Sequence, residues 1–284
     1  MTLHQVVTRA RGELQHAGIS FSTAALDAEL LARHVLQWDR ATWLTRRDDP
    51  ATADFETRYA AVMARRVARE PIAYIRGVQE FWGHEFHVTP AVLIPRPDTE
   101  LIVEAAGGFL RGQPEARVVD IGTGSGCIAI SLALEHPLAE IYATDISSDA
   151  LAVARENASR LGVDRLHFRR GRYLADTPRP VDLIVTNPPY VAASERVALA
   201  PEVREHEPAA ALFGGEDGLQ DIRAILDVSS AALAPGGWLI IEVGYNHGDR
   251  LRAEADRAAG LELVDFRTDL QGVPRAAIIR RAAA

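Results

Sequence analysis

Short apolar runs and helical segments alternate along the chain from about residue 117, and this alternation restricts the possible folds more than any other feature. Each apolar run has the length of a buried strand, and the segments between repeat their apolar residues at helical spacing. The expected elements are strand 118–121, helix 128–134, strand 141–144, helix 149–161, strand 166–168, strand 182–185 and strand 238–243. Strands joined by helices in this way form a parallel sheet covered on both faces. We therefore predict an α/β fold with a Rossmann-like, doubly wound and mostly parallel sheet.

The first seventy residues carry a helical pattern instead. Ser22 or Thr23 is placed to cap a helix, and the apolar positions that follow recur at helical spacing together with His34, which we interpret as a core residue. The apolar residues of this face are Leu26, Leu30, Leu31 and Val35, and those of a later helical face are Phe55, Tyr59, Val62 and Val67. The polar segment 46–50 separates the two patterns. We therefore predict a small helical-bundle domain over residues 1–70.

Residues 71–100 differ in residue pattern from the segments before and after them, and we interpret them as a linker. Residues 80–88 alternate and are rich in aromatic side chains, which predicts a short β-hairpin. Two prolines then flank Arg96 and make an extended, stiff segment. Asp98 or Thr99 is placed to cap the next helix. The remaining residues, 101–284, form the predicted main domain.

A glycine-rich loop lies between the first expected strand of the main domain and its helix. The loop residues are Gly122, Thr123, Gly124, Ser125 and Gly126. Glycines permit a tight turn and a close approach of ligand to backbone, and the helix behind them offers free N–H groups. Dinucleotide enzymes use Gly-x-Gly-x-x-Gly here, whereas this chain has Gly-x-Gly-x-Gly. The spacing therefore favours a smaller group with a carboxylate and an amine, such as the methionine end of S-adenosylmethionine.

Asp145 ends the second expected strand, a little over twenty residues beyond Gly122. A carboxylate at this place can accept hydrogen bonds from both hydroxyls of a ribose. A plain turn followed by an ordinary helix start would also explain the glycines and Asp145 separately. The combination of strand, glycine loop, helix and acid favours a nucleoside-binding site.

The segment Asn187-Pro188-Pro189-Tyr190 directly follows the strand at 182–185. Ligands of open α/β sheets bind at the carboxyl ends of the strands, so this segment should lie near the cofactor. The side-chain carbonyl of Asn187 and the backbone carbonyl of Pro188 can accept hydrogen bonds from both N–H groups of a planar amide or amine. Prolines keep these acceptors in place, and Tyr190 offers a flat face. We therefore predict methyl transfer to a planar nitrogen, with Asn187, Pro188 and Tyr190 as catalytic residues and Pro189 in the substrate site.

Composition excludes several other classes. The net charge of −8 argues against a protein that grips bare nucleic acid through its phosphates. One cysteine, Cys127, excludes an internal disulfide framework, and we interpret it as a small packing residue. No residue cluster has metal-ligand spacing, so we expect no metal. Without a long apolar run or a signal-peptide pattern, we expect a cytoplasmic protein that does not contact membranes.

The chain resembles the class I S-adenosylmethionine-dependent methyltransferases and, among them, the peptide chain release factor glutamine methyltransferases. The resemblance covers nearly the whole chain. The segments that carry it are residues 27–31, 71–77, 80–83, 94–100, 120–126, 187–190, 207–208, 212–219 and 269–275.

This resemblance implies a reaction and a set of roles. The reaction is transfer of a methyl group from S-adenosylmethionine, leaving S-adenosylhomocysteine, to the side-chain nitrogen (N5) of the glutamine in the Gly-Gly-Gln motif of class 1 release factors, which act in translation termination. It also implies that the helical domain helps to dock the release factor. The loop 122–126 would hold the methionine part and Asp145 the ribose, while Asn187 would contact both cofactor and glutamine. We expect a monomer without direct nucleic-acid contacts.

One segment departs from the family pattern. The family usually has Ser-Asp-Trp-Phe near the adenine, where this chain has Gly171-Arg172-Tyr173-Leu174. Tyr173 can replace the tryptophan as a flat surface for the adenine. Arg172 cannot replace the aspartate as an acceptor for the adenine amine. The sequence therefore does not identify the residue that accepts a hydrogen bond from that amine.

Three alternatives compete with this interpretation. A ribosomal protein glutamine methyltransferase would share the Asn-Pro-Pro-Tyr site, although residues 96–100 favour the release-factor branch. A DNA or RNA amino-methyltransferase must unstack its base and usually has a basic groove, which the negative charge disfavours. A catalytically silent binding module is disfavoured by the intact glycine loop, Asp145 and Asn187.

Overall fold

The computed structural model describes residues 1–283, which form two compact units. The helical unit comprises Met1–Val78 and the short segment Ala200–His206. The sheet unit comprises Gln79–Leu199 and the chain from Glu207 onward. Within the described residues, no helix is both long and apolar enough to cross a membrane.

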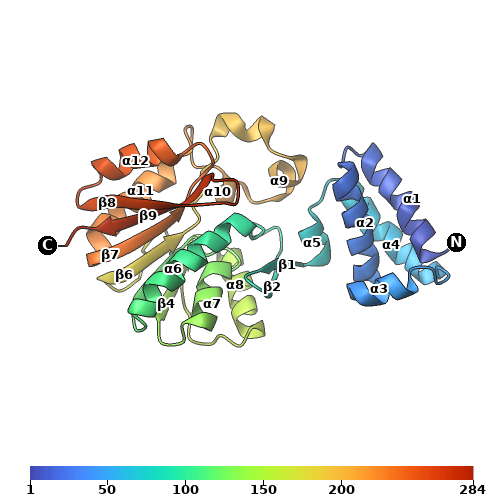
Figure 1. Ribbon diagram of the computed structural model, residues 1–284, viewed down its shortest axis with the longest axis horizontal. Helices are drawn as coiled ribbons and strands as arrows, with labels where there is room; N and C mark the ends of the chain where they lie inside the picture. The colour runs from blue at the N-terminus through green and yellow to red at the C-terminus, as the bar shows by residue number, and fades with distance from the viewer. Residues whose placement is uncertain (284) are drawn as a thin grey trace. The chain divides into compact units, whose positions relative to one another are not determined.

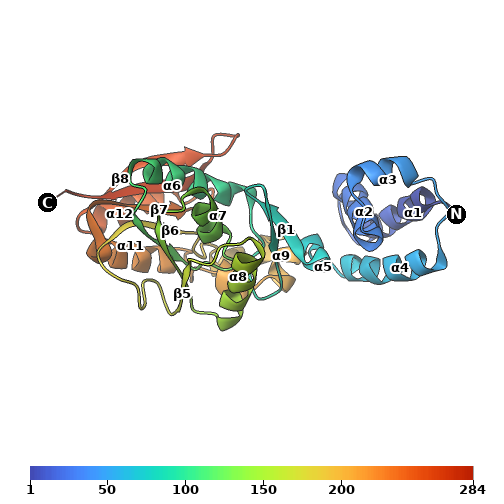
Figure 2. The same cartoon turned by 90° about the horizontal axis from the view of Figure 1, so that it is seen from below.

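The helical unit contains six helices, four of which begin at a side-chain cap. They are α1 (Leu3–His16), α2 (Phe21–Leu36), α3 (Arg40–Arg46), α4 (Ala53–Val67), α5 (Ile72–Arg76) and α9 (Pro201–His206). Helices α1, α2 and α4 lie side by side in both views (Figure 1 and Figure 2). The hydroxyl of Ser20, rather than that of Ser22 or Thr23, caps α2 by accepting the N–H of Thr23. The predicted caps were therefore wrong by two or three residues.

The buried face of α2 also differs from the prediction at one position. Leu26 is 58% exposed, while Asp27 and Leu31 are buried. Asp27 turns inward because the guanidinium of Arg66 on α4 donates to it over 2.7 Å. A carboxylate with such a partner can occupy a core position that hydrophobic periodicity assigns to an apolar residue. Burial raises the pKa of Asp27, and the hydrogen bond from Arg66 opposes that shift.

Helix α9 joins the helical unit through charged groups. Glu202 accepts hydrogen bonds from Arg66 over 2.9 Å and from Arg69 over 2.7 Å. The Arg66 side chain is only 5% exposed, so it needs both of its carboxylate partners, Asp27 and Glu202. The residues on both sides of α9 in the sequence belong to the sheet unit.

The sheet unit is built on seven strands in the order β5-β4-β3-β6-β7-β9-β8. Their bounds are β3 (Arg117–Ile121), β4 (Glu140–Asp145), β5 (His167–Arg170), β6 (Val181–Thr186), β7 (Leu233–Glu242), β8 (Leu261–Thr268) and β9 (Pro274–Arg281). The first five are parallel, which confirms the predicted strands and the mostly parallel α/β fold. The antiparallel pair β8 and β9 was not predicted. Strand β8 is an edge strand with charged residues and little burial, so it lacks the pattern of a buried strand.

Helices cover both faces of this sheet. Helices α6 (Glu100–Gly112), α7 (Cys127–Glu135) and α8 (Ser148–Arg160) pack on the face that buries Val118. Helices α11 (Gln220–Ala232) and α12 (Gly248–Arg257) pack on the face that buries Val119. Figure 1 draws the first three in green and the other two in orange. Neighbouring residues of β3 thus point to opposite cores, as a strand requires. Two short elements, η2 (Ala193–Ala198) and α10 (Ala209–Leu212), lie in the connection from β6 to α11.

The hairpin expected at residues 80–88 is present as β1 (Val78–Phe81) and β2 (His84–His87). Trp82 and Gly83 both have positive φ, as a tight two-residue hairpin turn needs. Asn157 on α8 holds the end of the hairpin, because its side chain bonds both the N–H and the carbonyl of His87. The same amide donates to the carbonyl of Ser125, which links the hairpin to the glycine loop.

The start of α6 differs from the prediction. A 3-10 turn, η1 (Pro97–Thr99), precedes the helix, and neither Asp98 nor Thr99 caps it with a side chain. The hydroxyl of Thr99 instead donates to Glu242 at the end of β7, over 2.6 Å. A buried carboxylate thus takes the hydroxyl that would otherwise cap the helix.

Candidate active site

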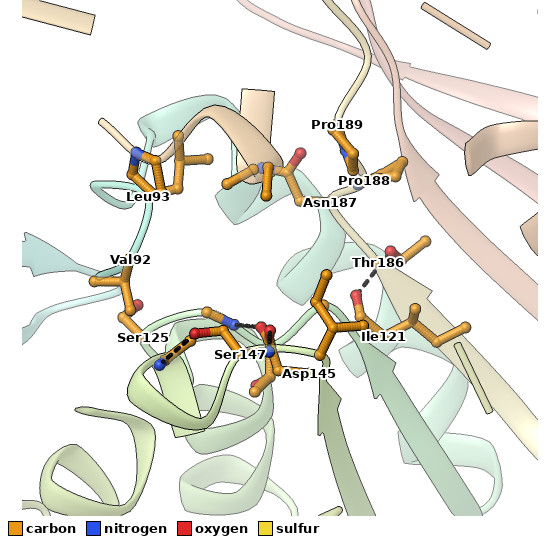
Figure 3. A pocket seen from close by; sticks show the side chains of 18 of the residues that line it. Val92, Leu93, Ile121, Ser125, Asp145, Ser147, Thr186, Asn187, Pro188 and Pro189 are labelled. Carbon is orange, nitrogen blue, oxygen red and sulfur yellow. Dashed lines mark hydrogen bonds between the residues drawn. The ribbon is translucent and has the colours of Figure 1, made fainter. Parts of the chain in front are cut away.

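A cavity of about 580 Å³ opens at the carboxyl ends of β4, β3 and β6 in the sheet unit. After β3 the chain adds β4 and β5 on one side of that strand, and it then adds β6 and β7 on the other side. The cavity therefore lies at the switch point where open α/β sheets bind ligands. The predicted site residues that line it are Gly122, Thr123, Gly124, Ser125, Asp145, Tyr173, Asn187, Pro188 and Pro189. Asn187 and Pro188 lie across the cavity from Asp145 and Ser147 (Figure 3). Gly126 and Tyr190 do not line it.

The three loop glycines have two different tasks. All three have positive φ. A Cβ atom on Gly122 would meet no atom within 4 Å, and one on Gly124 would meet only a backbone oxygen at 4.0 Å. Their surfaces are therefore open to the cavity. A Cβ on Gly126 would lie 2.8 Å from the side chain of Ile130 and 3.2 Å from that of Ala154. Gly126 thus permits close packing of α7 and α8 and does not face a ligand.

Asp145 is held rigidly at the end of β4. Its two carboxylate oxygens accept the backbone N–H of Gly124 over 3.0 Å and that of Ser147 over 2.9 Å. Each oxygen has a second lone pair, so the carboxylate can still accept from two hydroxyls of a ligand. This fixed acceptor lies beside the open glycines.

Asp120, two residues before Gly122, was missed as a site residue. Its side chain is completely buried and accepts the hydroxyl of Thr123 over 2.7 Å. Burial raises the pKa of Asp120 to about 7. An acidic residue inside a short apolar strand was the available sequence signal, because buried acids cluster at functional sites.

Asn187 at the end of β6 has a defined orientation. Its side-chain N–H donates to the hydroxyl of Thr99 over 3.1 Å. Thr99 is 2% exposed and lies on the cavity wall. Among residues 1–283, no group donates to the side-chain carbonyl oxygen of Asn187. That oxygen therefore remains available as an acceptor for a ligand.

Glu242, at the end of β7, completes this arrangement and was also missed. It is 2% exposed and accepts hydrogen bonds from Thr99 over 2.6 Å and from Tyr190 over 3.2 Å. Burial raises the pKa of the Glu242 carboxyl to about 7, against the two hydrogen bonds. Tyr190 therefore points its hydroxyl toward Glu242, its ring lies perpendicular to that of His247 with 6.3 Å between the ring centres, and it does not line the cavity.

The buried carboxyl makes stability depend on pH with a definite sign. The pKa of Glu242 is raised by folding, so its contribution is fully present below the ordinary value of 4.5 and is lost as pH rises through about 7. Relative to Glu242→Gln, the wild type should lose up to about 3 kcal/mol of unfolding free energy over this range. Urea unfolding of both proteins between pH 4.5 and 8 measures the difference. A difference that does not change with pH would contradict this assignment.

Two glycines hold the Asn187–Tyr190 turn from behind. A Cβ atom on Gly214 would overlap the carbonyl oxygen of Pro189, and one on Gly218 would overlap that of Tyr190. Val191, the next residue after the turn, is held by two backbone hydrogen bonds. Its N–H donates to the carbonyl of Leu212, and its carbonyl accepts the N–H of Gly214. The position of the turn thus depends on backbone contacts that only glycine permits.

Replacement of Gly214 by Ala should therefore damage the site directly. We expect a loss of about 1–3 kcal/mol of unfolding free energy and about a tenfold or larger fall in catalytic rate, because the added methyl displaces the backbone at Pro189. Gly12→Ala is the matched control, since a Cβ at that position in α1 meets nothing within 4 Å. It should stabilise the protein by about 0.5–1 kcal/mol. Equal behaviour of the two variants would contradict the packing argument.

The Leu93–Arg96 segment forms another wall of the cavity. Leu93, Pro95 and Arg96 line it. The carboxylate of Glu207 accepts the N–H of Ile94 over 3.3 Å and the guanidinium of Arg96. The stiff, proline-flanked segment is thus fixed by an acid from the part of the chain just after α9.

The remaining end of the cavity is formed by Arg172, Tyr173 and Asp221. The Tyr173 hydroxyl donates to one oxygen of Asp221, Oδ1, over 2.8 Å, and Arg172 approaches the same oxygen at 3.3 Å. The Arg172 guanidinium also lies over the Tyr173 ring, 5.0 Å from its centre. Sequence reasoning missed Asp221, because it reaches the cavity from α11, far along the chain. Among the described residues, no cluster of three or more His, Cys, Asp or Glu could hold a metal ion.

Comparisons with known proteins agree with this geometry. Residues 5–77 match the model of the PrmC N-terminal domain, and residues 99–210 match that of the methyltransferase small domain. A curated release factor glutamine methyltransferase from Cereibacter sphaeroides is 45% identical over 94% of this chain and 95% of its own. One from Koribacter versatilis is 40% identical over 99% of each chain.

A solved structure supports the fold alone. The crystal structure of a methyltransferase from Pyrococcus furiosus has a TM-score of 0.53 and 17% identity, over 79% of this chain and 100% of that one. The curated relatives match almost the full length of the chain at 40–45% identity. The chain therefore belongs to the release factor glutamine methyltransferase family.

Proposed function

We propose that the protein transfers a methyl group from S-adenosylmethionine to the side-chain nitrogen of a glutamine in the Gly-Gly-Gln motif of class 1 release factors. The observation that carries the proposal is the orientation of Asn187. Its N–H is occupied by Thr99, while its carbonyl oxygen is available to a substrate amide. Relatives of similar length are named release factor glutamine methyltransferases, which supports this substrate.

The cavity fits the cofactor in size and in its polar groups. A volume of about 580 Å³ suits a ligand of this kind. The open backbone at Gly122 and Gly124, next to the start of α7, would bind the methionine part, and Asp145 would accept the ribose hydroxyls. When bound, the cofactor supplies an electrophilic methyl group.

The residues of the chain would promote transfer by orienting the nitrogen. An amide nitrogen is a poor nucleophile because its lone pair is delocalised into the carbonyl. Asn187 Oδ1 and the Pro188 carbonyl would accept its two N–H groups and hold the nitrogen toward the methyl. As the nitrogen–carbon bond forms and the sulfur–carbon bond breaks, positive charge develops on the nitrogen, and the same acceptors stabilise it. The surplus proton then leaves to solvent.

We assign the adenine end to Tyr173 and Asp221. In the structure, Asp221 Oδ1 is used by Tyr173 and Arg172, while no described residue donates to Oδ2. A carboxylate oxygen can accept the adenine amine, and Asp221 would thereby replace the aspartate of the family pattern, whose place Arg172 takes in this chain.

Asp221→Ala should therefore weaken cofactor binding. Loss of one hydrogen bond to a charged acceptor corresponds to about a tenfold rise in the Kd of S-adenosylhomocysteine. Asp227→Ala is the control, because Asp227 is an exposed acid on the same helix. Calorimetric titration measures both. If the two variants bind equally well, Asp221 does not hold the adenine.

We further propose that the helical unit docks the release factor, and that the predicted division at residues 70 and 100 separates docking, linker and catalytic parts. The match of residues 5–77 to a domain found in this family supports the docking role. We also propose that the protein acts as a monomer in the cytoplasm, where translation factors work, without direct contact to nucleic acid or membrane.

The substrate is tested by competition among the alternatives. The protein is incubated with labelled cofactor and, in separate reactions, a purified class 1 release factor, ribosomal proteins or DNA, and labelled products are mapped to a residue. We expect label on the glutamine of Gly-Gly-Gln. Label confined to a ribosomal protein or to DNA, or none in any reaction, would overturn the proposal.

A further inference from the structure

We propose that Thr99 and Glu242 are positioning residues that set the orientation of the Asn187 amide, so that its oxygen and not its nitrogen faces the substrate. The inference rests on the proposed function, because it concerns the group that would hold the substrate amide. Neither residue touches the substrate in this scheme. Both act through Asn187.

The three residues form a continuous chain of hydrogen bonds. The Asn187 side-chain nitrogen lies 3.1 Å from the Thr99 hydroxyl, which lies 2.6 Å from Glu242 Oε2. Thr99 and Glu242 are each 2% exposed. Water therefore has little access to Thr99 and Glu242, and these two side chains depend on their protein partners to satisfy their hydrogen bonds.

The direction of the chain follows from the number of hydrogens. A threonine hydroxyl has one hydrogen to donate, and the Glu242 carboxyl, which is ionised above its pKa of about 7, can then only accept. Glu242 therefore takes the Thr99 hydrogen, and the Thr99 oxygen is left as an acceptor. Only the NH₂ group of Asn187 can satisfy that acceptor. If the amide were inverted, the Asn187 side-chain oxygen would face the Thr99 hydroxyl oxygen, whose only hydrogen is already donated to Glu242.

The other oxygen of Glu242 supports the same direction. Tyr190 donates its hydroxyl hydrogen to Oε1, so both oxygens of the carboxyl are used as acceptors. Arg275 on β9 stabilises the negative charge, while Asp98 opposes it. Because each carboxylate oxygen of Glu242 accepts a hydroxyl hydrogen, the Thr99 hydroxyl must donate its hydrogen to Glu242 and not to Asn187.

Orientation matters because the two ends of an asparagine amide have opposite character. The oxygen attracts the N–H groups of a substrate amide, whereas the NH₂ group would repel them. A misplaced or inverted acceptor would therefore slow the chemical step and leave the distant cofactor contacts unchanged. The bond from Thr99 to Glu242 also polarises the bond from Asn187 to Thr99, which makes the free oxygen a better acceptor.

A matched pair at Thr99 tests the chain. Thr99→Val keeps the shape of the side chain but removes the hydroxyl, while Thr99→Ser keeps the hydroxyl. At pH 8, where Glu242 is mostly ionised, we expect Thr99→Val to lower the single-turnover rate constant about a hundredfold, and Thr99→Ser to lower it less than about fivefold. The Kd of S-adenosylhomocysteine should change less than about threefold in both. Glu242→Gln should resemble Thr99→Val, because its NH₂ can donate to Thr99 and free the hydroxyl hydrogen for an inverted Asn187.

Two results would overturn the inference. One is a Thr99→Val enzyme with the wild-type rate constant. The other is a Thr99→Ser enzyme as slow as Thr99→Val, which would indicate a packing role.

A substrate-independent readout separates this inference from the proposed function. In protein with ¹⁵N-labelled asparagine, the side-chain NH₂ of Asn187 should exchange its hydrogens slowly in the wild type and in Thr99→Ser, and quickly in Thr99→Val. Equal exchange in all three would also overturn the chain. A wild type with slow exchange that fails to label release factor would refute the proposed function and leave the chain intact.

Discussion

Asn187→Ala should lower the rate constant for methyl transfer about a thousandfold, because it removes an acceptor that both orients the nitrogen and stabilises its developing charge. The Kd of S-adenosylhomocysteine should rise by less than about tenfold, since in the proposed site the glycine loop and Asp145 would bind the cofactor independently. Single-turnover methylation of release factor at saturating cofactor measures the first quantity, and calorimetric titration the second.

The control for this variant is Asn246→Ala. Asn246 is an exposed asparagine of the same unit whose side chain donates a hydrogen bond to Glu195 over 3.3 Å. Asn246→Ala should retain wild-type turnover. A fall in its turnover would show that loss of any asparagine of this unit impairs the enzyme. Turnover of Asn187→Ala within tenfold of the wild type would remove Asn187 from the mechanism.

Removal of residues 1–69 should abolish efficient methylation of intact release factor. If the helical unit docks the release factor, kcat/KM should fall about a hundredfold or more. A fall of this size corresponds to the loss of at least two well-packed contact residues. Methylation of a short Gly-Gly-Gln peptide should change little, because in the proposed site such a peptide would occupy only the cavity. Parallel assays on both substrates measure the ratio.

The deletion needs one compensating change. It removes Arg66 and Arg69, the two partners of Glu202 on α9. An acid left without partners would disturb α9 by itself, so the deletion is best combined with Glu202→Gln. Glu202→Gln in the full-length chain is the control for that substitution. Equal loss on factor and peptide would point to a damaged sheet unit, and no loss on either would exclude docking.

The sequence predicted those parts of the site that follow strands directly. Gly122, Asp145 and Asn187 each come at the end of a buried strand, and adjacent parallel strands bring such ends together whatever the details of packing. The strands themselves were predictable because parallel strands are nearly continuous apolar runs.

The residues that sequence reasoning missed owe their roles to tertiary contacts. Thr99 looked like a helix cap, since local pattern cannot reveal a carboxylate 143 positions away that takes its hydroxyl. Tyr190 looked like a flat surface for the substrate, but Glu242 draws its hydroxyl away from the cavity. Asp221 reaches the cavity only because α11 packs beside β6 and β7. Leu26 was placed in the core because the pairing of Asp27 with Arg66 is invisible to hydrophobic periodicity.

Helix α9 has a consequence for how proteins of this design can be recombined. The chain enters the sheet unit after Val78, returns to the helical unit at Ala200 and leaves it again after His206. A single recombination event near the linker therefore could not transfer the whole helical unit to another catalytic domain. A chimaera would need to exchange both segments together, and one that exchanged only the first would confront Glu202 with foreign partners. If the helical unit docks the substrate as proposed, variation in docking should arise by substitution on its surface more readily than by exchange of the whole unit.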